Sequence, residues 1–252
     1  MSARFDFSGK QIWVTGAGRG IGYETACRFA EAGAAVVGFD LAFPDTALPF
    51  TPCLLDIRDA AAVAGRCAAL LSQTPRLDVL VNGAGVLRMG ATEKLTQQDW
   101  QDCLAVNAGG VFNLLQAAIP QFQRQRGGAI VTVASNAAHV PRVGMAAYCA
   151  SKAAVRSLCL TAGLELAPYG VRCNLISPGS TDTPMLRGMW ASPAGEQSTI
   201  DGFPDQFKLG IPLGKIARPQ DIADAILFMA SDVAGHITLQ DIVIDGGATL
   251  GA

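Results

Sequence analysis

The stretch WVTGAGRGIG, residues 13–22, joins an apolar run to a glycine-rich turn and the start of a second apolar segment. The β-branched and aromatic residues before the turn predict a buried strand, and the residues from about Gly20 to Ala32 predict a helix. Glycines at this junction let the backbone approach a phosphate, which the positive N-terminal end of the helix then faces. The stretch therefore predicts a dinucleotide-binding unit, and the alternative is a tight turn with a purely structural role.

The rest of the chain repeats this alternation of strand and helix. Helices are expected at about 59–72, 98–123, 146–167 and 219–230. Further apolar, strand-like runs occupy residues 34–40, 52–57, 77–85, 127–135, 171–179 and 241–247. This order predicts a single-domain α/β fold over residues 1–252, a Rossmann-type doubly wound parallel sheet of about seven strands. The segment at about 180–215 is irregular and contains several Gly and Pro, so we expect a substrate lid there.

Composition excludes several classes of partner. The net charge is −2 and half of the 252 residues are hydrophobic, so we expect neither nucleic acid nor an anionic membrane as a partner. The start, MSARFDFSGK, lacks the apolar run of a signal peptide, and no purely apolar run reaches the ~18 residues of a membrane span. Seven cysteines without a CxxC pair, and only two histidines, predict free thiols in a reducing cytoplasm and no metal site.

Two charged residues give opposing signals for the nucleotide. Asp40 ends the second predicted strand, where a carboxylate accepts hydrogen bonds from the ribose hydroxyls of NAD and repels the 2′-phosphate of NADP. Arg19, inside the glycine turn, favours that phosphate. We give Asp40 more weight because of its position, and therefore predict NAD. Asp56 closes the third predicted strand and is a candidate partner of the adenine amino group.

The sequence YCASK, residues 148–152, places a tyrosine and a lysine four residues apart on one face of a predicted helix. A free phenol has a pKa of about 10 and is a poor base at neutral pH, but a nearby cation favours the phenolate. Tyr148 and Lys152 are therefore either an incidental pair or an acid–base pair.

The motifs TGAGRGIG, NGAG (82–85), YCASK and SPGST (177–181), together with Asn107 and Ser135, resemble the short-chain dehydrogenase/reductase family over essentially the whole chain. The resemblance implies that Tyr148 is the general acid/base and that Lys152 lowers its pKa and holds the nicotinamide ribose. It implies that Ser135 orients the reacting oxygen and that Asn107 holds a water. Gly83 departs from the family, which usually has Asn there. The implied cofactor site comprises Gly16, Gly18, Arg19, Gly20, Ile21, Gly22, Asp40, Asp56, Asn82, Gly83, Ala84, Tyr148, Lys152, Pro178, Gly179 and Thr181.

Within the family, the segments GVLRMGAT, GFPDQFKLGIPLGKIARPQDIA and HITLQDIVIDGGATLGA are similar to those of dehydrogenases of catechol siderophore biosynthesis. The resemblance implies oxidation of a cyclic dihydrodiol carboxylate by NAD, which aromatises the ring. Arg142 or Arg88 is expected to bind the carboxylate. Met89, Met145 and Phe207 are expected to form apolar walls. The runner-up is an NADPH-dependent ketoreductase of the same fold, and a non-catalytic dinucleotide sensor is the third hypothesis.

The two longest predicted helices carry few charges. No charge occurs from Cys103 to Gln123, and only Lys152, Arg156 and Glu165 occur from Ala146 to Ala167. A helix that covers one face of a sheet usually shows water a polar stripe. We therefore expect the outer faces of these helices to form an interface of a homotetramer, with residues 241–252 in a second interface.

Overall fold

A seven-stranded, fully parallel sheet forms the centre of the computed structural model, which describes residues 5–251. Residues 1–4 and 252, which the expected domain includes, lie outside the described residues. The strand order is β3-β2-β1-β4-β5-β6-β9, so the prediction of about seven parallel strands is confirmed. The strands are β1 (Gln11–Thr15), β2 (Ala35–Asp40), β3 (Thr51–Leu54), β4 (Val79–Asn82), β5 (Gly128–Val133), β6 (Val171–Pro178) and β9 (Asp241–Ile244).

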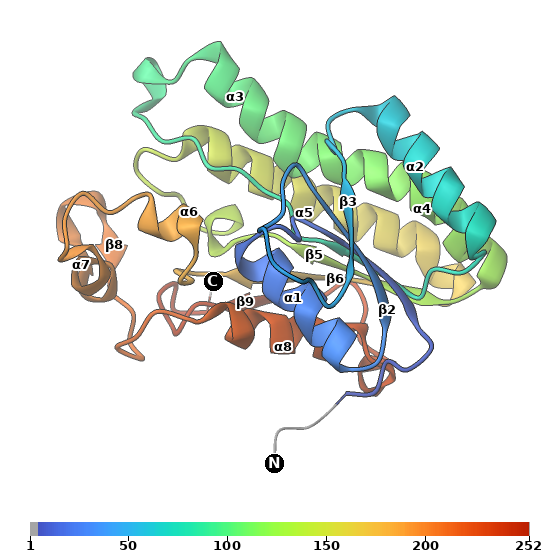
Figure 1. The fold of residues 1–252 in the computed structure, drawn as a ribbon. Coiled ribbons are helices and arrows are strands. Elements are labelled where there is room, and N and C mark those ends of the chain that lie inside the picture. Colours follow the sequence, from blue (N-terminus) through green and yellow to red (C-terminus); the bar gives the residue numbers. More distant parts are fainter. Residues whose placement is uncertain (1–4, 252) are drawn as a thin grey trace.

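Helices cover both faces of the sheet, as Figure 1 shows. One core lies between the sheet and α2, α4 and α5, and the other between the sheet and α1 and α8. The helices are α1 (Gly20–Glu31), α2 (Ala60–Gln73), α3 (Gln97–Leu104), α4 (Val111–Gln125), α5 (Ala146–Leu166) and α8 (Pro219–Ala230). Short 3₁₀ turns occupy η1 (Thr92–Lys94), η3 (Asn136–Ala138), η4 (Ala167–Tyr169) and η6 (Asp232–Ala234).

The helix expected at 98–123 is not a regular α-helix throughout. A π-helical segment, η2 (Ala105–Gly110), separates α3 from α4. Helix α2 and the loop before it pass close to residue 110, and this explains why a glycine stands there. A Cβ atom at this position would lie 2.3 Å from Ile57 Cδ1, in that loop. By length and hydropathy alone, Gln97–Gln125 is the one helical stretch among residues 5–251 that could cross a membrane. Helices that pack in a protein core have the same composition, and α4 packs against α2 and α5.

The segment expected to be an irregular lid contains regular elements. These are α6 (Pro184–Arg187), α7 (Gly195–Asp201) and an antiparallel hairpin of β7 (Gly202–Phe203) and β8 (Lys208–Leu209), joined by η5 (Pro204–Gln206). The hairpin is anchored to the end of α7, because Ile211 N–H donates to Ile200 O at 2.7 Å. The lid function itself stays a prediction.

Candidate active site

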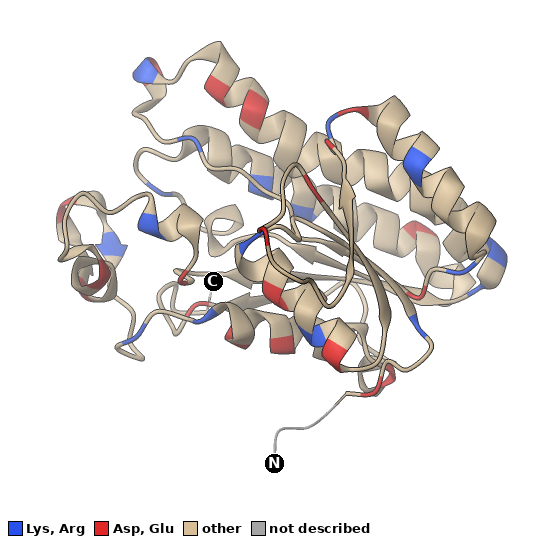
Figure 2. Ribbon diagram, in the orientation of Figure 1, with Lys and Arg blue, Asp and Glu red and all other residues tan. Residues whose placement is uncertain are grey.

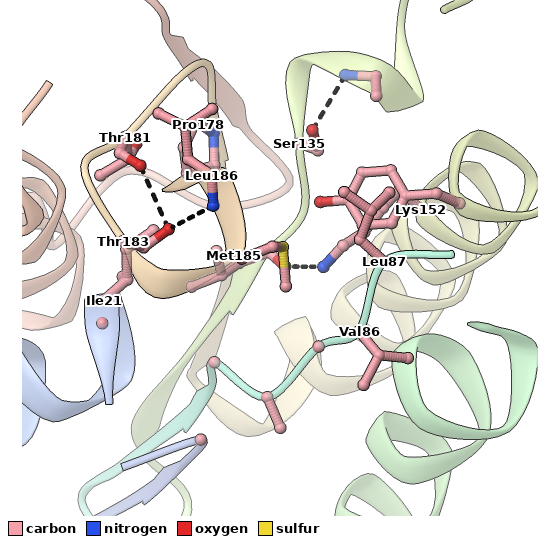
Figure 3. A pocket seen from close by; sticks show the side chains of 18 of the residues that line it. Ile21, Val86, Leu87, Ser135, Lys152, Pro178, Thr181, Thr183, Met185 and Leu186 are labelled. Atoms are coloured by element: carbon pink, nitrogen blue, oxygen red, sulfur yellow. Dashed lines mark hydrogen bonds between the residues drawn. The ribbon is translucent and has the colours of Figure 1, made fainter. Parts of the chain in front are cut away.

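A cavity of about 490 Å³ opens at the carboxyl ends of β1, β2, β4, β5 and β6. This is the edge at which doubly wound sheets bind their ligands. Figure 3 shows Ser135 and Lys152 on one side of this cavity, facing the segment that holds Thr181 and Thr183. The predicted residues that line the cavity are Gly16, Arg19, Gly20, Ile21, Gly22, Asp40, Asp56, Gly83, Ala84, Arg88, Ser135, Arg142, Met145, Tyr148, Lys152, Pro178, Gly179 and Thr181.

The glycine turn holds Asp40 in place. Gly18 N–H donates to Asp40 Oδ2 at 2.8 Å, and Leu41 N–H donates to Asp40 Oδ1 at 2.7 Å. The turn passes so close to the end of β2 that a Cβ atom on Gly18 would lie 2.1 Å from Ala42 O. Gly18 itself does not line the cavity. Each carboxylate oxygen of Asp40 keeps lone pairs for a further donor, which suits the two hydroxyls of a ribose.

Gly83, the position at which the family usually has Asn, packs closely against β1. A Cβ atom there would lie 2.7 Å from Thr15 O, so a side chain would require the turn or the strand end to shift. The hydroxyl of Thr15 accepts hydrogen bonds from Gly83 N–H at 3.1 Å and Ala84 N–H at 3.2 Å. Thr15 therefore braces the turn after β4. Asn82 lies behind this turn, fully buried, with Nδ2 donating to Thr132 Oγ1.

Asp56 lies in the loop after β3, since β3 ends at Leu54 and not at residue 57 as expected. Its carboxylate binds the Arg58 guanidinium at 2.6 Å, and this contact lowers the pKa of Asp56. Asp56 is thus an ionised acceptor at the cavity wall.

Tyr148 and Lys152 lie one turn apart in α5. Lys152 Nζ lies 5.8 Å from the centroid of the Tyr148 ring and donates to Val133 O at 2.8 Å. Gly85 completes this corner, because a Cβ atom there would lie 3.5 Å from Lys152 Nζ and 3.3 Å from Asn107 Oδ1. The strand end of β5, the turn after β4 and helix α5 together position the ammonium group.

Burial controls both titratable groups in the protein alone. It raises the pKa of Tyr148 to about 12, although a hydrogen bond with Ser135 opposes the rise. It lowers the pKa of Lys152 to about 8. The lowering of the phenol pKa expected from the sequence combines the Lys152 ammonium with the positive charge of a bound nicotinamide, and it stays a prediction.

Asn107 lies in the π-helical segment, fully buried and outside the cavity lining. Its Nδ2 donates to Val86 O at 2.9 Å and to Ser151 Oγ at 2.8 Å, and its Oδ1 accepts from Val86 N–H at 2.8 Å. Both amide hydrogens are thus used within the protein. A water at this position would have to donate to oxygen, either the second lone pair of Oδ1 or a backbone carbonyl.

The residues proposed for substrate binding separate into three groups. Arg142 and Met145 line the cavity, whereas Met89 and Phe207 do not, their side chains being 52% and 92% exposed. Arg88 also lines the cavity but binds Asp102 at 2.9 Å, so its charge is already paired. Lining residues absent from the predictions include Leu87, Met185, Met189, Lys208 and Leu209. Lys208 and Leu209 belong to a hairpin with two residues per strand. Strands this short show no alternation of apolar and polar residues, so the sequence did not predict which side chains face the cavity.

Comparison with known proteins gives one consistent family. The profile described as enoyl-(acyl carrier protein) reductase matches residues 16–249. The chain is 66% identical to a 2,3-dihydro-2,3-dihydroxybenzoate dehydrogenase of Escherichia coli over 98% of this chain and 100% of that one. It is 43% identical to the dehydrogenase of the same name from Bacillus subtilis, over 96% and 97%. The solved aldohexose dehydrogenase of Thermoplasma acidophilum superposes with a TM-score of 0.88 at 29% identity, covering 97% and 96% of the two chains.

Proposed function

The chain belongs to the short-chain dehydrogenase/reductase family, and we propose that it oxidises 2,3-dihydro-2,3-dihydroxybenzoate to 2,3-dihydroxybenzoate with NAD. The observation that carries the proposal is the 66% identity to an enzyme of that name over nearly the whole chain. By the same argument, the product serves siderophore biosynthesis. Removal of hydride from an alcohol carbon of the diene gives a dienone, and its tautomerisation to an aromatic ring makes the oxidation strongly favourable.

The groups around the cavity suit this reaction. Tyr148 Oη takes the proton of the reacting hydroxyl, while Ser135 Oγ donates to the same oxygen and fixes its position. A bound nicotinamide would supply the hydride acceptor and a positive ring charge. The Lys152 ammonium, together with that charge, would offset the burial that holds the Tyr148 pKa at about 12. The Lys152 ammonium, which lies beside Gly85, would also hold the nicotinamide ribose by donating a hydrogen bond.

Asp40 supports NAD over NADP. Its carboxylate is held at the cavity wall by two backbone N–H groups, so it cannot easily turn away from a 2′-phosphate. The runner-up, an NADPH-dependent ketoreductase, draws on Arg19, which lines the same cavity. In a partly dry cavity, a fixed carboxylate beside a phosphate dianion costs several kcal/mol, so Asp40 dominates.

The test is incubation of the purified protein with the dihydrodiol acid and either nucleotide. We expect NADH and the catechol acid to appear in equal amounts, with NADP at least about tenfold less effective. Reduction of a 3-oxoacyl thioester by NADPH, without oxidation of the dihydrodiol acid, would establish the ketoreductase instead. Binding of NAD without either turnover would indicate a sensor.

We also propose that the chain forms a homotetramer in the cytoplasm. Phe112 of α4 and Leu164 of α5 are 46% and 65% exposed, and Figure 2 shows few charges along α4 and α5. An apolar face that pairs with itself is what a two-fold interface requires. Seven free thiols support a reducing compartment. Light scattering at micromolar concentration tests the assembly, and a mass near that of one chain would exclude it.

A further inference from the structure

We infer that Lys208, carried by the β7–β8 hairpin, and Arg142, carried by the loop before α5, together form the subsite for the carboxylate of the substrate. This inference rests on the proposed function for the identity of the substrate, but not for the existence of a carboxylate site. Lys208 was not a candidate from the sequence. Its assignment depends on where the hairpin places it.

Both side chains line the cavity, and neither forms an ion pair among the described residues, although the charge of Asp245 raises the pKa of Arg142 against the larger effect of burial. Among residues 5–251, no carboxylate lies within ion-pair distance of Arg142 or Lys208, and no hydrogen bond uses their side-chain nitrogens. Arg88, the other candidate for binding the carboxylate, is paired with Asp102, so its charge is less available to a substrate. Half-buried cations without an anionic partner are unusual, and here two of them line one cavity.

The surroundings of the two cations are apolar, which strengthens their mutual repulsion. Met145, Met185, Met189 and Leu209 also line this cavity. Burial lowers the pKa of Lys208, and the positive charge of Arg142 lowers it further. Two like charges so close that one shifts the pKa of the other are stabilised when an anion lies between them. Arg can bind a carboxylate through two parallel N–H groups, and Lys adds a point charge.

The turn before Lys208 directs this side chain toward the cavity. Phe207 adopts a left-handed conformation with φ of 53°, which is uncommon for a bulky residue. Its N–H donates to Pro204 O at 2.9 Å, and its ring is 92% exposed. The chain thereby turns Phe207 outward and Lys208 into the cavity wall, where Nζ lies 5.1 Å from the Phe203 ring centroid. Strained backbone of this kind concentrates at ligand-binding sites.

Calorimetric titration of the NAD-saturated protein with benzoate tests the subsite without relying on turnover. Lys208→Gln should weaken benzoate binding by about tenfold or more, the scale of a lost charge-assisted hydrogen bond. Lys208→Arg should retain binding within about threefold. Benzamide, which has the same ring without the charge, should bind Lys208→Gln and the unmodified protein equally. The matched control is Lys215→Gln, because Lys215 is exposed and lies outside the cavity lining.

The same variants separate this inference from the proposed function. With the dihydrodiol acid, Lys208→Gln should raise KM and leave kcat and NAD affinity within about twofold. Equal benzoate affinity for the unmodified protein and Lys208→Gln, with NAD still bound, would overturn the subsite whether or not the dihydrodiol acid is oxidised. Lys208-dependent benzoate binding in a protein that does not oxidise the dihydrodiol acid would uphold the subsite and refute the proposed function.

Discussion

The Lys152 ammonium lies 5.8 Å from the centre of the Tyr148 ring, in a corner closed by Val133 O and Gly85. Burial acts on both groups against ionisation, since it raises the pKa of the phenol and lowers that of the ammonium. The pair is therefore held in an arrangement that is costly in the protein alone. Perturbed pKa values of this kind are expected in active sites, where the chemistry requires a charged group in a cavity that excludes water.

The first prediction concerns Tyr148. Replacement by Phe removes the phenolic oxygen, which accepts the substrate proton in its ionised form, and kcat should fall at least about 100-fold. NAD affinity, measured by fluorescence titration, should change little because Lys152 remains. The matched control is Tyr169→Phe, since Tyr169 packs under Arg126 outside the cavity lining. Near-normal turnover of folded Tyr148→Phe would rule out this residue as the general base.

The second prediction concerns the cost of Lys152. A pKa lowered from 10.5 to about 8 corresponds to ~3 kcal/mol of destabilisation while the buried amine is charged. Lys152→Met removes this cost and one hydrogen bond worth about 1 kcal/mol. The free energy of unfolding of the cofactor-free protein at pH 7 should rise by roughly 1–2 kcal/mol, although activity is lost.

The pH dependence of this difference follows from the sign of the shift. Between pH 8 and 10.5 the folded protein has released the Lys152 proton and the unfolded chain still holds it, so the stability of the unmodified protein rises with pH. The advantage of Lys152→Met should accordingly shrink across this window in urea titrations. An advantage that stays constant from pH 7 to 10 would show that folded Lys152 keeps its proton throughout this range, so that burial does not lower its pKa.

The third prediction concerns the nucleotide. Asp40→Ser keeps a hydrogen-bonding side chain and removes the charge that opposes a 2′-phosphate. The ratio of kcat/KM for NADP to that for NAD should rise at least about tenfold. Adding Arg19→Gln to this variant should reverse part of the gain, because Arg19 lines the same cavity. An unchanged ratio in Asp40→Ser would mean that other residues set the preference.

The fourth prediction concerns the turn after β4. Thr15→Val keeps the shape of a buried side chain and leaves Gly83 N–H and Ala84 N–H without their acceptor. The free energy of unfolding should fall by about 2 kcal/mol, and KM for NAD should rise because this turn lines the cavity. Thr51→Val, at the exposed start of β3, should change the stability by less than about 0.5 kcal/mol. Equal effects of the two substitutions would show that the Thr15 hydroxyl does not stabilise the turn after β4.

The fifth prediction concerns Asp241, whose side chain is 4% exposed. Its carboxylate accepts hydrogen bonds from Arg156 at 2.8 Å and from Ser177 at 2.6 Å. His139 Nε2 lies at hydrogen-bond distance from the same carboxylate, 2.9 Å away. Asp241→Asn would leave the Arg156 charge without its partner and should lower the free energy of unfolding by about 2–3 kcal/mol. Chemical denaturation measures the change. Because this cluster joins β6, α5 and the turn after Ser135, a loss below about 0.5 kcal/mol would show that it is not structural.

The central sheet was predictable because each strand is an apolar run of its own, and the glycine turn at 15–22 marks where the cofactor edge must lie. Tyr148 and Lys152 were predictable because helical spacing alone brings them together. Lys208 was not, since only the turn through Phe207 decides which way it faces. The ion pair of Arg88 with Asp102 was also hidden, because it joins a loop to a helix 14 residues away.

The π-helical segment 105–110 contains one residue more than a regular α-helix of the same length along its axis. Each residue turns a helix by about 100°, so the extra one sets α4 in a different rotational phase from α3. This phase keeps Asn107 against Val86 and Ser151 while α4 presents its apolar side to α2. A one-residue deletion in this segment would therefore be far more damaging than most substitutions there. Length, and not only residue type, is under constraint between Leu104 and Val111.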